Sequence, residues 1–99
     1  AIRKACEKLN SFQLDGCIIY TSCEPCPMCL GAIYWSRPDG LYYANTKSDA
    51  AKINFDDKFI YDEINLPVYS RKLPTKQILR KEALEAFKLW SYSNTKIEY

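Results

Sequence analysis

Three of the five cysteines in this 99-residue chain stand at three-residue intervals, as Cys23, Cys26 and Cys29. Pro27 can occupy the first turn of a helix, where its missing N–H costs little, so the last two thiols are expected on one face of a first helical turn. The positive end of the helix dipole favours thiolate over thiol at that place. Two such thiolates suit a soft divalent metal, and the spacing favours zinc.

Three other interpretations of the cysteines stay open on spacing alone. Cys-x-x-Cys between a strand and a helix is also the setting of a thioredoxin-like redox pair, although that interpretation leaves Pro25 unexplained. A run of three cysteines is typical of iron–sulfur sites too, but Ile33 and Tyr34 stand where the bacterial pattern requires Cys and Pro. The third is an inert, buried pair of cysteines. Zinc is favoured over all three.

The elements around the cysteines have the order of an α/β domain. Apolar spacing and turn residues predict, in chain order, a helix over 2–10, a strand over 17–21, a helix over 27–35 and a strand over 41–44. A strand, helix, strand unit implies parallel strands joined by a right-handed crossover. The middle helix has few polar residues, so we expect it to be buried.

The second half of the chain is predicted to be mainly helical. Ser48 is a plausible N-cap for a short helix, and helical spacing recurs over 56–64 and again over 81–92, before a polar tail. Two prolines indicate a loop over 65–74, and residues 77–79 are predicted to form a short strand. We predict one domain over residues 1–99, since a chain of this length builds a single core.

Composition excludes several classes of function. The chain is 47% apolar and 26% charged, as in globular proteins, and no apolar run approaches the roughly 20 residues that cross a bilayer, so no membrane partner is expected. Its 14 basic and 12 acidic residues are scattered, which does not favour a nucleic-acid partner. An odd number of cysteines without a secretion signal predicts a cytoplasmic protein.

Residues Thr21 to Trp35 resemble the zinc-binding region of the cytidine deaminase-like superfamily of nucleobase deaminases. The superfamily signature is His-x-Glu followed by Pro-Cys-x-x-Cys, and its second half is recognised in Pro25-Cys26-x-x-Cys29. The resemblance is to bacterial guanine deaminases in particular. It extends to residues 49–51, 55–57 and 98–99.

This resemblance implies a three-layer α/β/α fold with a mixed central sheet, here truncated at the N-terminus. It also implies that Cys26 and Cys29 are the two thiolate ligands of a zinc ion whose third protein ligand is a histidine. Zinc lowers the pKa of water toward neutrality, and a glutamate that is not a ligand moves the protons. The implied reaction is the hydrolysis of guanine to xanthine and ammonia.

The chain departs from this pattern because it contains no histidine. We expect the His-x-Glu motif to precede Ala1, in the first part of a helix that the sequence enters partway. The third zinc ligand and the catalytic glutamate would both lie there. Without them, the chain is expected to be inactive.

The resemblance also assigns two residues to substrate binding. Guanine presents N–H and amino donors on its Watson–Crick edge, and Asp57 corresponds to a carboxylate that accepts from them. Tyr99 corresponds to a terminal tyrosine that covers the site, and a homodimer is implied. A tRNA adenosine deaminase of the same superfamily, and a non-catalytic zinc-stabilised module, are the alternative functions.

Overall fold

The computed structural model describes residues 1–55 and 57–97. They fall into two compact units that divide between Leu66 and Pro67, and each unit is described by itself. None of the described helices combines the length and the apolar character needed to cross a membrane.

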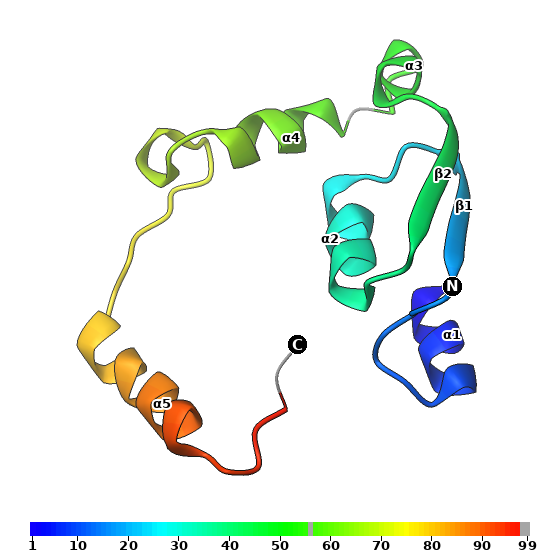
Figure 1. Ribbon diagram of the computed structural model, residues 1–99. Helices are drawn as coiled ribbons and strands as arrows, with labels where there is room; N and C mark the ends of the chain where they lie inside the picture. The colour runs from blue at the N-terminus through cyan, green and yellow to red at the C-terminus, as the bar shows by residue number, and fades with distance from the viewer. Residues whose placement is uncertain (56, 98–99) are drawn as a thin grey trace. The chain divides into compact units, whose positions relative to one another are not determined.

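The first unit contains a strand, helix, strand arrangement (Figure 1). Helix α1 (Ile2–Leu9) precedes strand β1 (Ile18–Cys23), helix α2 (Pro27–Ser36) and strand β2 (Gly40–Asn45). The two strands are parallel, with Tyr20 opposite Tyr42, and these two rings stack with centroids 5.3 Å apart. The predicted α/β class and parallel pairing are confirmed.

Turn residues set where these elements begin and end. Helix α1 ends at Asn10, whose left-handed backbone (φ 49°) lets the next N–H, that of Ser11, donate to the carbonyl of Cys6 at 3.1 Å. Gly16 also has a positive φ of 76°, which glycine adopts without strain. Its N–H donates to the carboxylate of Asp39 at 3.0 Å, so the turn before β1 is tied to the turn before β2.

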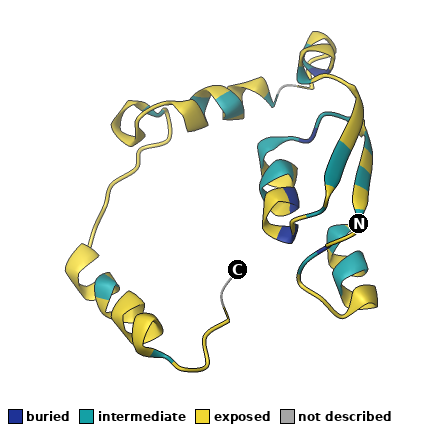
Figure 2. Ribbon diagram, in the orientation of Figure 1, coloured by how far each residue is buried: buried dark blue, intermediate teal, exposed yellow. Residues whose placement is uncertain are grey.

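The core of the described structure is small, as the few dark segments of Figure 2 show. Its apolar members are Leu14, Pro25, Ile33 and Ala50. The prediction that the helix over 27–35 is buried was wrong for one face, because Tyr34 and Trp35 are 75% and 63% exposed. An apolar helix is buried only where other elements cover it, and the described elements cover one side of α2.

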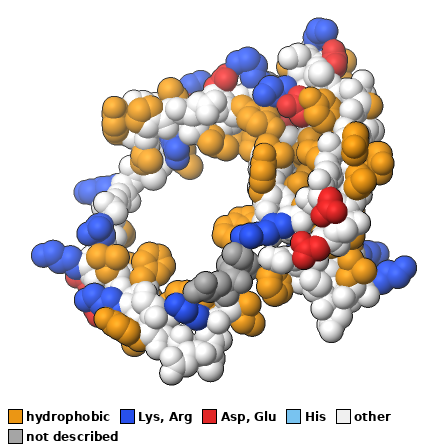
Figure 3. Space-filling view, viewed as in Figure 1, with side chains coloured by type: hydrophobic (Ala, Val, Ile, Leu, Met, Phe, Trp, Pro, Cys, Tyr) orange, Lys and Arg blue, Asp and Glu red, His pale blue; other side chains and the backbone are white. Residues whose placement is uncertain are grey.

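Hydrophobic side chains are also exposed on the strands, where orange atoms are visible along β1 and β2 (Figure 3). Tyr20 is 74% exposed and Tyr42 is 58% exposed. Residues along β1 alternate between exposed and half-buried, as expected of a strand with one covered face.

Two helices complete the first unit: α3 (Lys47–Lys52) and α4 (Lys58–Asn65). Thr46, not the predicted Ser48, is the N-cap of α3. Its hydroxyl accepts the N–H of Asp49 at 3.2 Å, and the Asp49 carboxylate accepts the N–H of Thr46 at 3.1 Å. Ser48 lacks such a reciprocal partner, and a capping box of this kind satisfies two N–H groups at once.

The second unit contains a short 3-10 helix, η1 (Val68–Ser70), within the predicted loop, and helix α5 (Arg80–Tyr92), close to the predicted bounds. The predicted strand over 77–79 was wrong. These residues are irregular, and Leu79 has a left-handed backbone (φ 51°) that leads into α5. A strand requires a partner to pair with, and within the described residues β1 and β2 pair only with each other.

Candidate metal centre

The cysteine cluster lies where β1 passes through a proline turn into α2. Backbone pairing continues past β1, because the N–H of Glu24 donates to the carbonyl of Asn45 at 2.7 Å. The Asn45 side chain donates in turn to the carbonyl of Ser22 at 3.1 Å. The turn therefore starts from a position fixed by the neighbouring strand.

Cys26 and Cys29 occupy different backbone settings. Cys26 is the N-cap of α2, with an extended backbone (φ −63°, ψ 163°), and Pro27 follows it as the first helical residue. Its carbonyl accepts the N–H of Leu30 at 2.8 Å, which begins the helix. Cys29 lies within the first turn, so the helix itself sets its direction. The predicted helix start at Pro27 is confirmed.

The structure brings the two thiols together. The pKa of the Cys29 thiol is raised, mainly by a hydrogen bond with Cys26. The charge of Cys26 and burial raise it further, in that order. Two adjacent thiolates repel each other, and a divalent cation between them removes that repulsion. The pair therefore fits a thiophilic metal as two of its ligands.

Cys26 and Cys29 alone do not complete a metal site within the described residues. Among the described residues there is no group of three or more His, Cys, Asp or Glu side chains that could hold a metal ion. The two thiols thus form only part of a ligand set.

Helix α4 brings a tyrosine to the proline turn. The hydroxyl of Tyr61 donates to the carbonyl of Pro25 at 2.6 Å, across 36 positions of sequence. Burial is the main cause that raises the pKa of Tyr61, and the negative charges of Asp57, Glu24 and Cys26 add to it. Tyr61 therefore connects α4 to the turn that carries Cys26.

Asp57, predicted from the resemblance, lies at the beginning of α4, one helical turn before Tyr61. Its carboxylate oxygen Oδ1 is buried, and no described residue donates a hydrogen bond to it. A buried carboxylate oxygen without a donor is costly, so a protein that keeps one commonly supplies the donor from a ligand or an ordered water. Tyr99, the other predicted substrate residue, lies outside the described residues.

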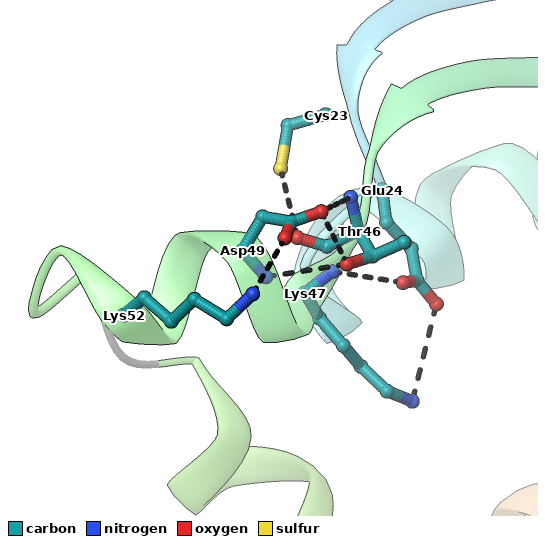
Figure 4. A network of polar contacts seen from close by, with 6 residues as sticks. All are labelled: Cys23, Glu24, Thr46, Lys47, Asp49 and Lys52. Atoms are coloured by element: carbon teal, nitrogen blue, oxygen red, sulfur yellow. Dashed lines mark hydrogen bonds and ion pairs between the residues drawn. The ribbon is translucent and has the colours of Figure 1, made fainter.

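A second group of polar contacts joins the proline turn to the start of α3 (Figure 4). The Glu24 carboxylate accepts the backbone N–H of Lys47 at 2.9 Å and lies 3.9 Å from its ammonium group. The thiol of Cys23 points to the carbonyl of Thr46, 3.9 Å away. Glu24 thus makes a structural hydrogen bond, and Cys23 faces the start of α3.

Two residues of this region are not predicted by the sequence. Tyr61 follows Asp57 by four positions, which places both on one face of α4, and this spacing is the signal that could have identified it. Lys47 lies over the Tyr61 ring, with Nζ 4.4 Å from the centroid. No pattern in the sequence indicates that contact, because the two residues come from different helices.

Comparisons with known proteins agree with this arrangement. Residues 1–45 match the family model described as the cytidine and deoxycytidylate deaminase zinc-binding region. The whole chain is 54% identical to guanine deaminase of Bacillus subtilis (strain 168) and spans 64% of that protein's length. A tRNA-specific adenosine deaminase of the same organism is 40% identical over 42 residues, which is 42% of this chain and 26% of that protein.

The fold is similar to a solved structure as well. The X-ray structure of guanine deaminase from Bacillus subtilis superimposes with a TM-score of 0.93 at 55% identity, covering 100% of this chain and 63% of that chain. Residues 1–45 therefore match the zinc-binding region of cytidine and deoxycytidylate deaminases, and the whole chain is similar in sequence and in fold to a guanine deaminase.

Proposed function

We propose that this chain provides the cysteine half of the zinc centre, and part of the base-binding pocket, of a guanine deaminase. Guanine and water are converted to xanthine and ammonia in that reaction. The observation that carries the proposal is the buried Asp57 oxygen without a described donor, on the helix whose Tyr61 contacts the cysteine turn. The 54% identity to a guanine deaminase over all 99 residues supports the choice of base.

Cys26 and Cys29 would hold the zinc ion, together with a histidine from sequence that precedes Ala1. When bound, zinc supplies an activated water for replacing the amino group at C2 of guanine. The glutamate of the same upstream motif would carry the protons.

Asp57 would orient the base. Guanine offers an N1–H and a 2-amino group on one edge, and a buried carboxylate accepts both donors. A base without these donors leaves the carboxylate unpaired, which disfavours its binding. The carboxylate therefore selects guanine and presents C2, the atom between the two donors.

The remaining expectations belong to the complete protein. We propose a cytoplasmic homodimer that acts on a free base, with Tyr99 covering the bound guanine. The balanced charge, with 14 basic and 12 acidic residues, does not supply the basic surface that RNA binding requires.

The test compares substrates on the complete protein loaded with zinc. We expect ammonia release from guanine, with xanthine as the product, and none from an RNA hairpin that presents adenosine. Deamination of the hairpin alone would assign the protein to the tRNA adenosine deaminases instead. Stoichiometric zinc with no ammonia from either substrate would identify a non-catalytic module.

A further inference from the structure

We infer that Tyr61 is a positioning residue for the metal centre: its hydroxyl fixes the peptide before Cys26, and this sets the distance between the two thiolates. The inference deepens the proposed function and rests on its zinc centre. The contact that carries it is the 2.6 Å hydrogen bond from the Tyr61 hydroxyl to the carbonyl of Pro25.

The backbone explains why Cys26 needs such a support and Cys29 does not. Cys29 is held by the hydrogen bonds of α2, which extends from Pro27 to Ser36. Cys26 lies outside the helix as its N-cap, so its side chain follows the peptide that precedes it. The proline ring restricts φ of Pro25, and the ψ angle of Pro25 then determines where the Pro25–Cys26 peptide points.

Tyr61 restricts this ψ angle of Pro25. A rotation about ψ of Pro25 moves the Pro25 carbonyl and, with it, the Cys26 side chain. The hydroxyl of Tyr61 holds the carbonyl at hydrogen-bond distance and opposes this rotation. The charge of Cys26 contributes to the raised pKa of Tyr61, so the phenol also lies within electrostatic range of that thiol.

The ring of Tyr61 is itself held in place. The ammonium of Lys47 lies 4.4 Å from the ring centroid, and the same Lys47 is bound through its backbone N–H to Glu24, the residue before Pro25. The tyrosine therefore meets the turn at a defined position. Asp57 lies one helical turn before it, so the same contact also joins the helix that follows the proposed base-binding carboxylate to the cysteine turn.

The decisive variant is Tyr61→Phe in the complete protein, because it removes the hydroxyl and keeps the ring beneath Lys47. Loss of a partner that orients a metal ligand typically weakens metal binding by about 10- to 100-fold. We expect a loss of that size in zinc affinity, measured by competition with a chelator of known affinity. In the cobalt-substituted protein, the thiolate-to-cobalt absorption bands should shift.

Two further variants separate positioning from a general effect on the fold. Tyr69→Phe changes a tyrosine that is 88% exposed, and we expect wild-type zinc affinity. Lys47→Met removes the cation above the ring and leaves the hydroxyl, so a smaller loss of about fivefold or less is expected. Melting of the metal-free proteins shows how far each change affects the fold alone.

The inference is overturned if Tyr61→Phe binds zinc as tightly as the wild type, with an unchanged cobalt spectrum. It is overturned equally if its melting temperature falls while its zinc affinity matches that of Tyr69→Phe, because Tyr61 would then serve the fold only. Guanine turnover of the wild type is measured in the same preparations. A wild type that binds zinc without deaminating guanine refutes the proposed function, and the affinity comparison still decides the role of Tyr61.

Discussion

Glu24 and Lys47 contact each other at two points: the carboxylate accepts the backbone N–H of Lys47 at 2.9 Å and lies 3.9 Å from its ammonium group. The contact joins the turn that carries Cys26 to the first residue of α3. The Glu24 side chain is only 23% exposed, so solvent screens this contact less than it screens a surface ion pair.

Glu24→Ala is therefore expected to destabilise the fold. A hydrogen bond to a charged group contributes about 1.5–3 kcal/mol, and a loss in that range should appear in urea denaturation monitored by circular dichroism. Glu85→Ala is the matched control, because it removes an ion pair with Lys88 in which both side chains are more than 60% exposed. It should cost about 1 kcal/mol or less, and equal losses for the two variants would contradict the structural role of Glu24.

The zinc content of serine variants distinguishes the cysteines that bind zinc from the one that does not. Cys26→Ser and Cys29→Ser should each reduce zinc in the complete protein well below one equivalent, measured by elemental analysis after dialysis. Each variant removes one of the two proposed thiolate ligands. Cys23→Ser is the control within the same run, because the Cys23 thiol faces the carbonyl of Thr46. It should keep its zinc, and a loss equal to that of the other two variants would make Cys23 a ligand.

Asp57→Asn tests recognition of the base. The variant keeps the shape of the side chain but replaces one acceptor by a donor and removes the charge. A hydrogen bond to a charged group is worth about 1.5–3 kcal/mol, so kcat/KM for guanine should fall by about 10- to 100-fold with zinc content unchanged. Asp62→Asn, on the exposed side of α4 where Asp62 pairs with Lys58, should leave turnover unchanged. Wild-type turnover in Asp57→Asn would exclude Asp57 from the site.

The capping box of α3 predicts a pH dependence. Hydrogen bonds from the Thr46 side chain and backbone, and then from Lys52, lower the pKa of Asp49 from 3.8 to about 2. Because the folded state lowers this pKa, the stabilisation by ionised Asp49 is fully present above pH 3.8 and is lost as the pH falls through about 2.

Thr46→Ala should raise the pKa of Asp49 toward 3.8, followed by NMR of the Asp49 carboxyl carbon during an acid titration. Loss of the N-cap should also cost about 1 kcal/mol of stability. Ser48→Ala serves as the control, since Ser48 lies inside α3. A shift in the pKa of Asp49 with Ser48→Ala, and none with Thr46→Ala, would move the cap back to the residue that the sequence predicts.

The sequence alone determined the features that depend on local chemistry. Pro27 starts α2 because a residue without an N–H fits the first helical turn, and Asp15-Gly16 forms the turn before β1 because glycine adopts a positive φ. The apolar segments on either side of α2 form the parallel strands that the strand, helix, strand order requires. The motif at Cys26 and Cys29 predicted the resemblance to zinc-binding deaminases, whose zinc-binding region matches residues 1–45.

Tertiary structure decided the features that depend on partners distant in sequence. Residues 77–79 have strand-like composition, yet they remain irregular because no described strand pairs with them. Ser48 and Thr46 are both good capping residues, and only the reciprocal contact with Asp49 selects Thr46. Tyr61 becomes part of the candidate site solely because folding brings α4 against Pro25, 36 positions away. Side-chain type and spacing encode local preferences, whereas a long-range contact exists only once the chain has folded.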